Sequence, residues 1–270
     1  MRPLRGFYII FDNGRCLLRD HFNDATLAPA CFSETGYWRG VWSEGPPGAA
    51  LEELDGRHLA FHGALYNRHE LARQLDLPDN TSTVNLLLKA WEAWPSDWTA
   101  RLDGLYVLAH WSRDGRDLTL RRDVSGALGL FYARTASGGL ALSSHLGTLV
   151  RLPGVSRRLA RQGLHEYLRM LDIAAPNTIY EGVRAVPAGE GVILDPQHPE
   201  VETVLQPRVF PPIEMPFDDA VTELESRLAA SIGRRLDGAA RPAAFLSGGV
   251  DSSLICALAA RQRPDLQTLT

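Results

Sequence analysis

The sequence has few lysines, few cysteines and no long hydrophobic run. Lys89 is its one lysine, so the positive charge comes almost entirely from arginine. Cys16, Cys31 and Cys256 form no close pair, which argues against a disulfide framework and against a zinc knuckle. The apolar run Phe7–Phe11 is too short for a signal peptide or a membrane span. We therefore expect free thiols, no membrane partner and a cytoplasmic location.

The charge balance also excludes partners. A formal net charge of -4 and a pI of about 6.1 give no general attraction to phosphate backbones, so nucleic acid is not expected as a partner. Hydrophobic residues make up 45% and charged residues 22%, which is typical of a chain that buries a core. A length of 270 residues favours two domains.

The first two hundred residues read as short strands separated by turns, with a few helices between them. Turn signals such as Asp12-Asn-Gly14 and Ser137-Gly-Gly139 favour antiparallel sheets in an α+β domain. The expected strands are Phe7–Phe11, His58–Phe61, Tyr106–Trp111, Leu118–Arg121, Leu128–Tyr132 and Leu140–Ser143.

Apolar residues three and four positions apart predict the helices. The expected helices are Asn67–Leu75, Thr83–Trp94, Leu164–Leu171 and Asp218–Leu236. Asn67 and Glu70 have capping-box spacing, and Asp218 or Asp219 is available as an N-cap. Four prolines between 207 and 216 indicate a linker, which places a domain boundary between residues 205 and 206.

A glycine-rich loop lies between an apolar strand and a helix. The expected strand Pro242–Leu246 is followed by Ser247-Gly-Gly-Val-Asp-Ser-Ser253 and by the helical pattern Leu254–Ala260. Adjacent glycines let the backbone approach an anion, and the N–H groups of a helix start attract negative charge. The serine hydroxyls can donate to phosphate oxygens, and Asp251 can bind Mg²⁺. The predicted pyrophosphate site consists of Ser247, Gly248, Gly249, Val250, Asp251, Ser252 and Ser253.

The loop could also be a Walker loop or a purely structural turn. A Walker loop needs a Gly-Lys-Ser/Thr sequence, and the absence of lysine disfavours a kinase or GTPase. A purely structural turn would use the serines as helix caps and Asp251 to stabilise the helix dipole. A seven-residue match between a strand and a helix favours the phosphate-binding interpretation.

Motifs along nearly the whole chain resemble the asparagine synthetase superfamily, which includes asparagine synthetases, β-lactam synthetases and lasso-peptide cyclases. The loop Ser247–Ser253 is similar to the loop of that superfamily. Phe61–Leu71 resembles F-N-G-E-I-Y-N-x-x-E-L, and Arg122–Tyr132 resembles R-D-x-x-G-x-x-P-L-Y-Y. Asn177–Gly189 is similar to T-I-F-x-G-I-x-x-L-P-P-G.

The resemblance implies a fold and a chemistry. Residues 1–205 are expected to form a glutamine amidotransferase type 2-like domain, a four-layer αββα Ntn-hydrolase-like sandwich. Residues 206–270 are expected to form the first part of an α/β PP-loop ATP-pyrophosphatase domain with a parallel sheet. The implied cofactors are ATP and Mg²⁺, and the substrate is a small molecule or peptide with a carboxylate and an amine. The carboxylate attacks the α-phosphate, pyrophosphate leaves, and the amine captures the acyl-adenylate; a homodimer is left open.

The sequence departs from the family at three positions that serve glutamine hydrolysis. Arg2 replaces the nucleophilic cysteine that follows the initiator methionine, His62 stands where the family has asparagine, and Ser82 stands where it has aspartate. We therefore expect no catalytic residue for glutamine hydrolysis in the first domain. His58 and His62 have the spacing of helical metal ligands but lie in an expected strand, so a metal site is disfavoured. Asp123 and Gly126 are interpreted as a turn rather than as catalytic groups.

Four functions compete. The first is AMP-forming amide-bond synthesis without glutamine hydrolysis, although this chain alone, which stops one helix into the ATP domain, is not expected to be competent. The second is a glutamine-hydrolysing asparagine synthetase, and the third is a truncated, non-catalytic binding module. A more distant fourth is another PP-loop enzyme such as a tRNA-modifying thiolase, which would bring cysteines or a basic surface.

Overall fold

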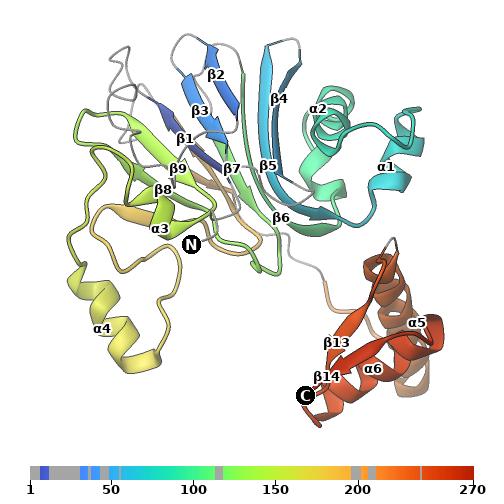
Figure 1. The fold of residues 1–270 in the computed structure, drawn as a ribbon. Coiled ribbons are helices and arrows are strands. Elements are labelled where there is room, and N and C mark those ends of the chain that lie inside the picture. The colour runs from blue at the N-terminus through green and yellow to red at the C-terminus, as the bar shows by residue number, and fades with distance from the viewer. Residues whose placement is uncertain are drawn as a thin grey trace. The chain divides into compact units, whose positions relative to one another are not determined.

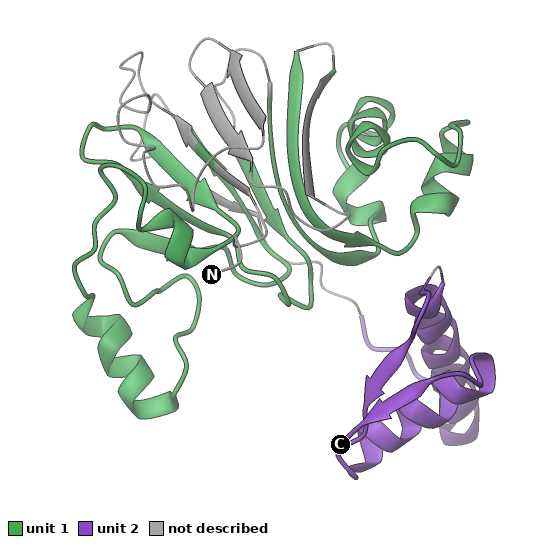
Figure 2. Cartoon of the chain, viewed as in Figure 1, with its two compact units in different colours: residues 1–208 green, residues 209–270 purple. Residues whose placement is uncertain are grey.

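The computed structural model describes strands 7–11, 31–35, 38–42, 49–54 and 202–205 and residues 56–112, 118–195, 211–237 and 239–270. For the strands 7–11, 31–35, 38–42, 49–54 and 202–205 the structure describes the backbone. Of their side chains it describes those of Ile9 and Leu54. The chain divides into two compact units, Met1–Arg208 and Val209–Thr270 (Figure 2). The boundary predicted from the sequence lies between residues 205 and 206.

Unit 1 contains two six-stranded antiparallel sheets that face each other (Figure 1). The strands of the first sheet are β1 (Phe7–Phe11), β2 (Cys31–Thr35), β3 (Trp38–Trp42), β8 (Phe131–Arg134), β9 (Leu140–Ser143) and β10 (Val183–Ala185). Those of the second are β4 (Ala49–Leu54), β5 (Arg57–Leu65), β6 (Gly104–Ser112), β7 (Leu118–Arg122), β11 (Gly191–Leu194) and β12 (Glu202–Leu205). The strand orders are β10-β8-β9-β1-β3-β2 and β12-β11-β7-β6-β5-β4.

The main core lies between the two sheets and follows from the period-2 alternation of the strands. Leu118 and Leu120 of β7 and Leu140 and Leu142 of β9 belong to one cluster and are fully buried. Alternate residues of a strand point to opposite faces, so the other face of each sheet needs a separate cover.

Helices supply that cover on the second sheet. The helices α1 (Arg68–Gln74), α2 (Thr83–Ala93) and the 3-10 turn η1 (Trp98–Arg101) lie against its outer face (Figure 1). Leu86, Leu87 and Leu88 of α2 are fully buried in the same cluster as Phe61 of β5 and Leu108 of β6.

His110 of β6 also points toward this helical layer. Its ring makes T-shaped contacts with the rings of Trp91 and Trp98, with centroid distances of 4.5 and 5.2 Å. Trp98 is buried, as is Trp111, which lies in the core between the sheets.

The outer face of the first sheet has a thinner cover. The single-turn helix α3 (Leu146–Leu149) and the following residues Val150 and Leu152 pack against Ala133 and Ala141. The order helix, sheet, sheet, helix agrees with the four-layer arrangement expected from the sequence. A further helix, α4 (Arg161–Met170), stands apart from both sheets and buries only Gly163 (Figure 1).

Unit 2 is a short α/β unit. It consists of α5 (Phe217–Leu236), β13 (Ala243–Phe245), α6 (Val250–Gln262) and β14 (Gln267–Leu269). The two strands are parallel, with Ala243 opposite Gln267, and α6 is the crossover between them. Ile232 of α5 and Leu258 and Ala259 of α6 form its core.

Several expected element boundaries were wrong. The strand expected at Leu128–Tyr132 is Phe131–Arg134, and the helix expected from Leu164 begins at Arg161. Helix α5 begins at Phe217 after Pro216, so Asp218 and Asp219 lie in its first turn rather than at the N-cap.

Asn67 does not use its side chain to cap α1. Its Nδ2 instead donates to Arg101 O at 2.8 Å, and its Oδ1 accepts from Asp103 N at 3.1 Å. Asn67 therefore joins α1 to the chain between η1 and β6, a long-range role that local spacing could not show.

Candidate functional site

The glycine loop connects β13 to α6 in unit 2. Leu246 N donates to Leu269 O at 2.7 Å, which extends the pairing of β13 with β14 to the residue before the loop. Helix α6 begins at Val250, four residues before the helix expected from the sequence. Asp251, Ser252 and Ser253 therefore lie in the first turn of the helix, and the loop proper is Ser247-Gly-Gly249.

Glycine is required at position 248 by backbone conformation. Gly248 has a φ of +82°, in the left-handed region that residues with a Cβ rarely adopt. A Cβ added there would meet nothing within 4 Å, so space is not the constraint. Gly249 is the N-cap of α6, and no side chain caps the helix. The N–H groups of the first turn consequently have no side-chain acceptor within the described structure and can donate to an anion.

Two serine hydroxyls close the loop. Ser252 Oγ donates to Gly249 O at 3.1 Å, and Ser247 Oγ lies 3.0 Å from Ser252 Oγ. Because Ser252 uses its proton on Gly249 O, Ser247 donates to Ser252 in this arrangement. Both hydroxyls can rotate toward a bound anion, because they are exposed or half-buried. Ser253 N donates to Gly249 O at 3.1 Å, as the helix requires.

Asp251 is the acidic residue of the first helical turn, and it is exposed. No group of three or more potential metal ligands occurs among the residues that the structure describes. One carboxylate together with phosphate oxygens is nonetheless the ligand set that Mg²⁺ commonly takes beside a nucleotide. The residues present thus fit Mg²⁺ that arrives with phosphate, rather than a metal ion held by protein alone.

Lys89, the single lysine, lies in unit 1 on α2. Its Nζ pairs with Glu92 Oε2 at 2.9 Å, and both side chains are exposed. No lysine lies in Val209–Thr270, so the Gly-Lys-Ser/Thr sequence of a Walker loop is absent from this unit.

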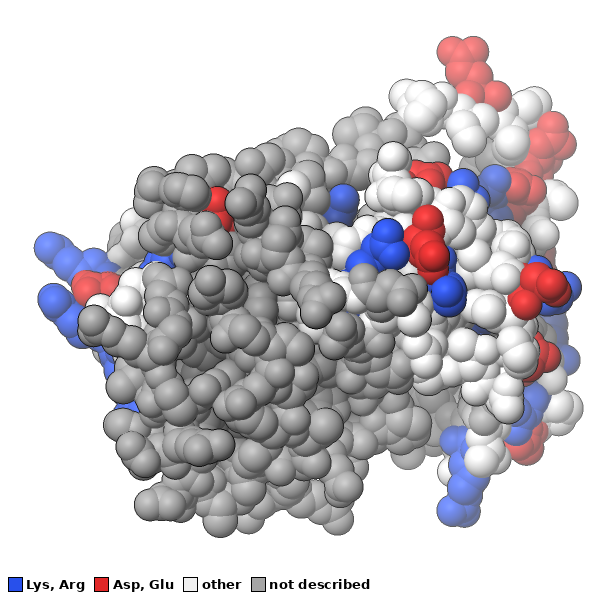
Figure 3. All heavy atoms as spheres, turned by 90° about the horizontal axis from the view of Figure 1, so that it is seen from above, with Lys and Arg blue, Asp and Glu red and all other residues white. Residues whose placement is uncertain are grey.

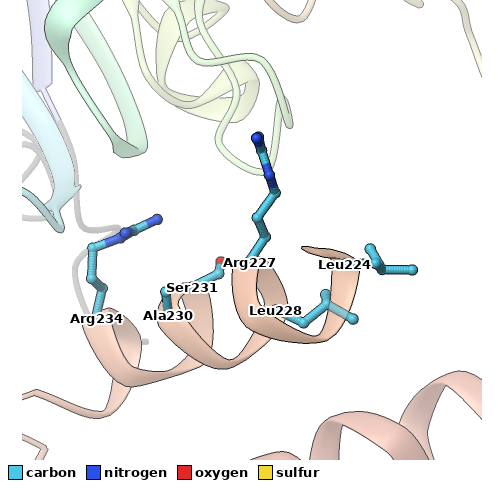
Figure 4. A pocket seen from close by; sticks show the side chains of 6 residues that line it. All are labelled: Leu224, Arg227, Leu228, Ala230, Ser231 and Arg234. Atoms are coloured by element: carbon cyan, nitrogen blue, oxygen red, sulfur yellow. The ribbon is translucent and has the colours of Figure 1, made fainter. Parts of the chain in front are cut away.

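A hollow of about 390 Å³ runs along α5. Arg227, Ser231 and Arg234 are polar groups on its wall (Figure 4), and Arg227 Nε donates to Glu223 Oε1 at 2.6 Å. The hollow contains no residue of the glycine loop, and all its described walls come from one helix.

Two of the family's substrate-holding positions lie in the described part of unit 1. His62 of β5 is half-buried on the strand face that also carries Ala60, and burial lowers the pKa of its imidazole. Ser82 Oγ accepts from Asn85 N at 3.2 Å and is the N-cap of α2. A serine that caps a helix supplies no carboxylate for an amino-acid substrate. Arg2 and Cys16 lie outside the described residues, and Cys31, the first residue of β2, is described in its backbone alone.

His58 and Asp123, which were considered as a metal ligand and as a catalytic group, have structural contacts in unit 1. His58 stacks on Trp111 with ring centroids 5.3 Å apart, and both His58 and His62 lie on strand β5. Asp123 is buried, its carboxylate accepts from Tyr106 N at 3.2 Å, and its carbonyl accepts from Gly126 N at 3.1 Å. The turn interpretation of Asp123 and Gly126 is confirmed.

Arg122 has a structural role that its sequence pattern does not indicate. Its guanidinium donates to the carbonyls of Gly126, Leu128 and Val186, and thereby fixes the segment after the turn to the segment before β11. Val186 is 64 positions from Arg122 in the sequence, so local patterns do not predict this contact. The Asp-x-x-Gly turn that follows Arg122 is the one nearby sequence signal.

The described surface is mixed in charge. On the face seen in Figure 3, acidic and basic side chains of the described residues alternate. No helix within the described ranges is long and apolar enough to cross a membrane.

Comparisons with known proteins match both units. Residues 50–203 match the model of the glutamine amidotransferase domain family, and residues 223–270 match that of asparagine synthase. A Mycobacterium tuberculosis (strain ATCC 25618 / H37Rv) protein, named as a proposed glutamine-hydrolyzing asparagine synthetase, is 31% identical over 238 residues, which cover 84% of this chain and 36% of the relative. Glutamine-hydrolyzing asparagine synthetase 3 of Bacillus subtilis (strain 168) is 26% identical, covering 79% of this chain and 35% of the relative.

The chain thus spans about a third of the length of the curated relatives it matches. Among solved structures, glutamine phosphoribosylpyrophosphate amidotransferase from B. subtilis matches 98% of this chain and 59% of its own, with 13% identity and a TM-score of 0.46.

Proposed function

Because the chain belongs to the asparagine synthetase superfamily and carries a class II glutamine amidotransferase domain, we propose that its protein forms amide bonds with ATP. The reaction would release pyrophosphate and AMP through an acyl-adenylate, without hydrolysis of glutamine. The observation that supports this proposal best is the strand, Gly-Gly turn and uncapped helix start at Ala243–Gln262. The substrate would be a small molecule or peptide that brings both the carboxylate and the amine.

Each residue of the loop has a task in this proposal. The backbone N–H groups at the start of α6 and the hydroxyls of Ser247, Ser252 and Ser253 would bind the pyrophosphate part of ATP. Asp251 would hold Mg²⁺, which neutralises negative charge on the departing pyrophosphate. Because these groups are already arranged before binding, they would align the α-phosphate with the attacking carboxylate at little further entropic cost.

The absence of glutamine hydrolysis rests on unit 1. His62 occupies the position of a substrate-binding asparagine, and the hydroxyl of Ser82 is engaged in capping α2. A class II domain that lacks these two side chains has lost two of the groups with which the family holds glutamine. The remaining role of this domain would be structural.

A second candidate function is asparagine synthesis with glutamine as the nitrogen donor. The names of the mycobacterial and Bacillus relatives, both glutamine-hydrolyzing asparagine synthetases, favour it. A third, a non-catalytic binding module, would keep the fold of both units without binding nucleotide.

The test uses the complete protein with two probes. Equilibrium dialysis with α,β-methylene-ATP and Mg²⁺ should show binding that Gly248→Val abolishes. Gly138→Val is the matched control, because Gly138 has a φ of +83° and is equally open but lies in a turn of unit 1.

Incubation with glutamine should produce no glutamate above the level of a boiled sample. Glutamate formation would move the asparagine synthetase function to first place. Failure of the unmodified protein to bind the analogue at millimolar concentration would leave the non-catalytic module.

A further inference from the structure

Arg121 of β7 lies on the outer face of the second sheet, away from the core between the sheets. Strands β6 and β7 lie side by side, with Arg121 opposite Leu108 (Figure 1). Leu108 packs in the cluster that contains the helical layer, whereas Leu120, the neighbour of Arg121 in sequence, belongs to the core between the sheets. Because side chains alternate along a strand, that of Arg121 shares the outer face with Leu108.

A glycine on the next strand makes room for this arginine. Gly191 of β11 pairs with Arg121, and a Cβ added to Gly191 would lie 2.6 Å from Arg121 Cδ and 3.0 Å from its Nε. The arginine side chain therefore passes over the position that has no side chain of its own. Arg121 is half-buried there, and its Nε is enclosed without a hydrogen-bond partner among the described residues.

Tyr106 and His110 are the diagonal neighbours of Arg121 on β6. They lie two residues on either side of Leu108, so they share its face and are within reach of a long side chain on β7. His110 Nδ1 is buried without a hydrogen-bond partner in the described part of the chain, and no described group accepts from the Tyr106 hydroxyl. Burial, followed by the charge of Asp123, raises the pKa of Tyr106 to about 12, so its hydroxyl keeps its proton. Three groups that can donate a hydrogen bond thus lie together without an acceptor.

The charge of Arg121 is not neutralised by a described carboxylate. Asp123, farther along β7, accepts from Tyr106 N at 3.2 Å and from Ser125 N at 2.9 Å, and Arg121 forms no ion pair within the described residues. Burial lowers the pKa of Arg121, yet a guanidinium does not lose its proton in a protein. A half-buried charge without a counterion is unfavourable, and a bound anion would remove that cost.

We propose that Arg121, Tyr106 and His110 form a binding site for a small free carboxylate. The planar guanidinium would donate two parallel N–H bonds to the two carboxylate oxygens, with the Tyr106 hydroxyl and the Nδ1–H tautomer of His110 as further donors. A singly charged carboxylate suits this half-buried place better than a phosphate dianion, because the cost of desolvation rises with charge. The formal net charge of -4 gives the chain no general attraction to anions, so binding would depend on these local groups. The inference goes beyond the proposed ligase chemistry and does not depend on it.

Acetate is the probe, and NMR of the 270-residue chain with isotopically labelled arginine is the measurement. The Nε–H signal of Arg121, assigned by its loss in Arg121→Lys, should shift saturably with a dissociation constant of about 10 mM or lower. Sodium chloride at the same concentrations should leave this signal in place, because chloride screens charge but cannot accept two parallel bonds. The Nε–H signals of Arg101 and Arg227, which donate to Asp97 and Glu223, are internal controls that acetate should not move.

A single hydroxyl group tests whether Tyr106 belongs to the site. Tyr106→Phe keeps the ring that stacks on Phe61 and removes one donor, so the affinity for acetate, read at the Arg121 signal, should fall about fivefold. Tyr180→Phe is the matched control, because it removes the same atom from a residue that packs against the first sheet. Its affinity for acetate should equal that of the unmodified chain.

Four results would overturn the proposal. The first is an Arg121 signal that does not move up to about 50 mM acetate. The second is an equal shift with chloride, which would show screening alone. The third is an equal affinity for acetate in Tyr106→Phe and in the unmodified chain, which would remove the three-residue site. The fourth is the absence of an Arg121 Nε–H signal, because rapid exchange with water would show that this nitrogen is not enclosed.

Discussion

His110 should make unit 1 less stable as the pH falls below neutrality. The ring lies against Trp91 and Trp98, and its Nδ1 is buried without a hydrogen-bond partner among the described residues. Burial, together with the positive charge of Arg121, lowers the pKa of His110 from 6.5 to about 3. The neutral ring is therefore the form that the folded state accepts.

The direction and size of the effect follow from linkage. Below pH 6.5 His110 binds a proton in the unfolded chain but stays neutral in the folded chain. The contribution of His110 to the free energy of unfolding is therefore complete above this pH and is lost as the pH decreases toward 3. The two pKa values differ by an amount worth about 5 kcal/mol in total, as an upper bound. About 2 kcal/mol of this should already be lost between pH 7.5 and pH 5.

Urea unfolding followed by tryptophan fluorescence can measure this loss, because all six tryptophans lie in unit 1. His110→Phe keeps an aromatic ring between the two tryptophans and removes the titrating group. Between pH 7.5 and pH 5 the free energy of unfolding of this variant should therefore decrease by about 2 kcal/mol less than that of the unmodified chain. Equal pH dependence in the unmodified chain and in His110→Phe would refute the reasoning.

Three further predictions concern the glycine loop and α4. Gly248→Ala forces a Cβ residue into a φ of +82° at a cost of about 1–2 kcal/mol, so affinity for α,β-methylene-ATP should fall about tenfold; the same loss in Gly138→Ala would contradict a role for the loop. Asp251→Ala should abolish pyrophosphate release by the complete protein, because Mg²⁺ loses its protein ligand; near-normal release would remove the metal assignment. Gly163→Ala would place a methyl group on Thr178 O and displace α4, which should cost about 1–3 kcal/mol in urea unfolding. An unchanged midpoint for that variant would show that α4 is held elsewhere.

Local patterns predicted the strands that alternate cleanly between two turns. The range of β9 came out as expected at Leu140–Ser143, because a Gly-Gly turn precedes it and a serine pair ends it. The strand expected at Leu128–Tyr132 was displaced because Arg122 holds the carbonyls of Gly126 and Leu128. That contact depends on the fold around the guanidinium, which period-2 alternation does not encode.

The sequence predicted the strand, the glycine pair and the helix of the candidate site, but it predicted the start of the helix less well. The strand, the Gly-Gly pair and the helix follow from sequence, yet the helix begins at Val250 because the polar residues Asp251, Ser252 and Ser253 form its first turn. Polar first turns escape a search for apolar periodicity, although such residues are common there. The environment of His110 was not predicted, because it arises where a sheet face meets helices distant in sequence.

The exposed ion pair of Lys89 with Glu92 offers a practical handle. An amine-directed reagent has two targets in this sequence, the ε-amine of Lys89 and the α-amine of Met1, and the second reacts selectively near neutral pH because of its lower intrinsic pKa. A fluorophore or biotin placed at alkaline pH after blocking the α-amine would therefore sit at one defined point on α2. Molecules immobilised through that point would all present the same face of unit 1, with every residue of the glycine loop chemically untouched.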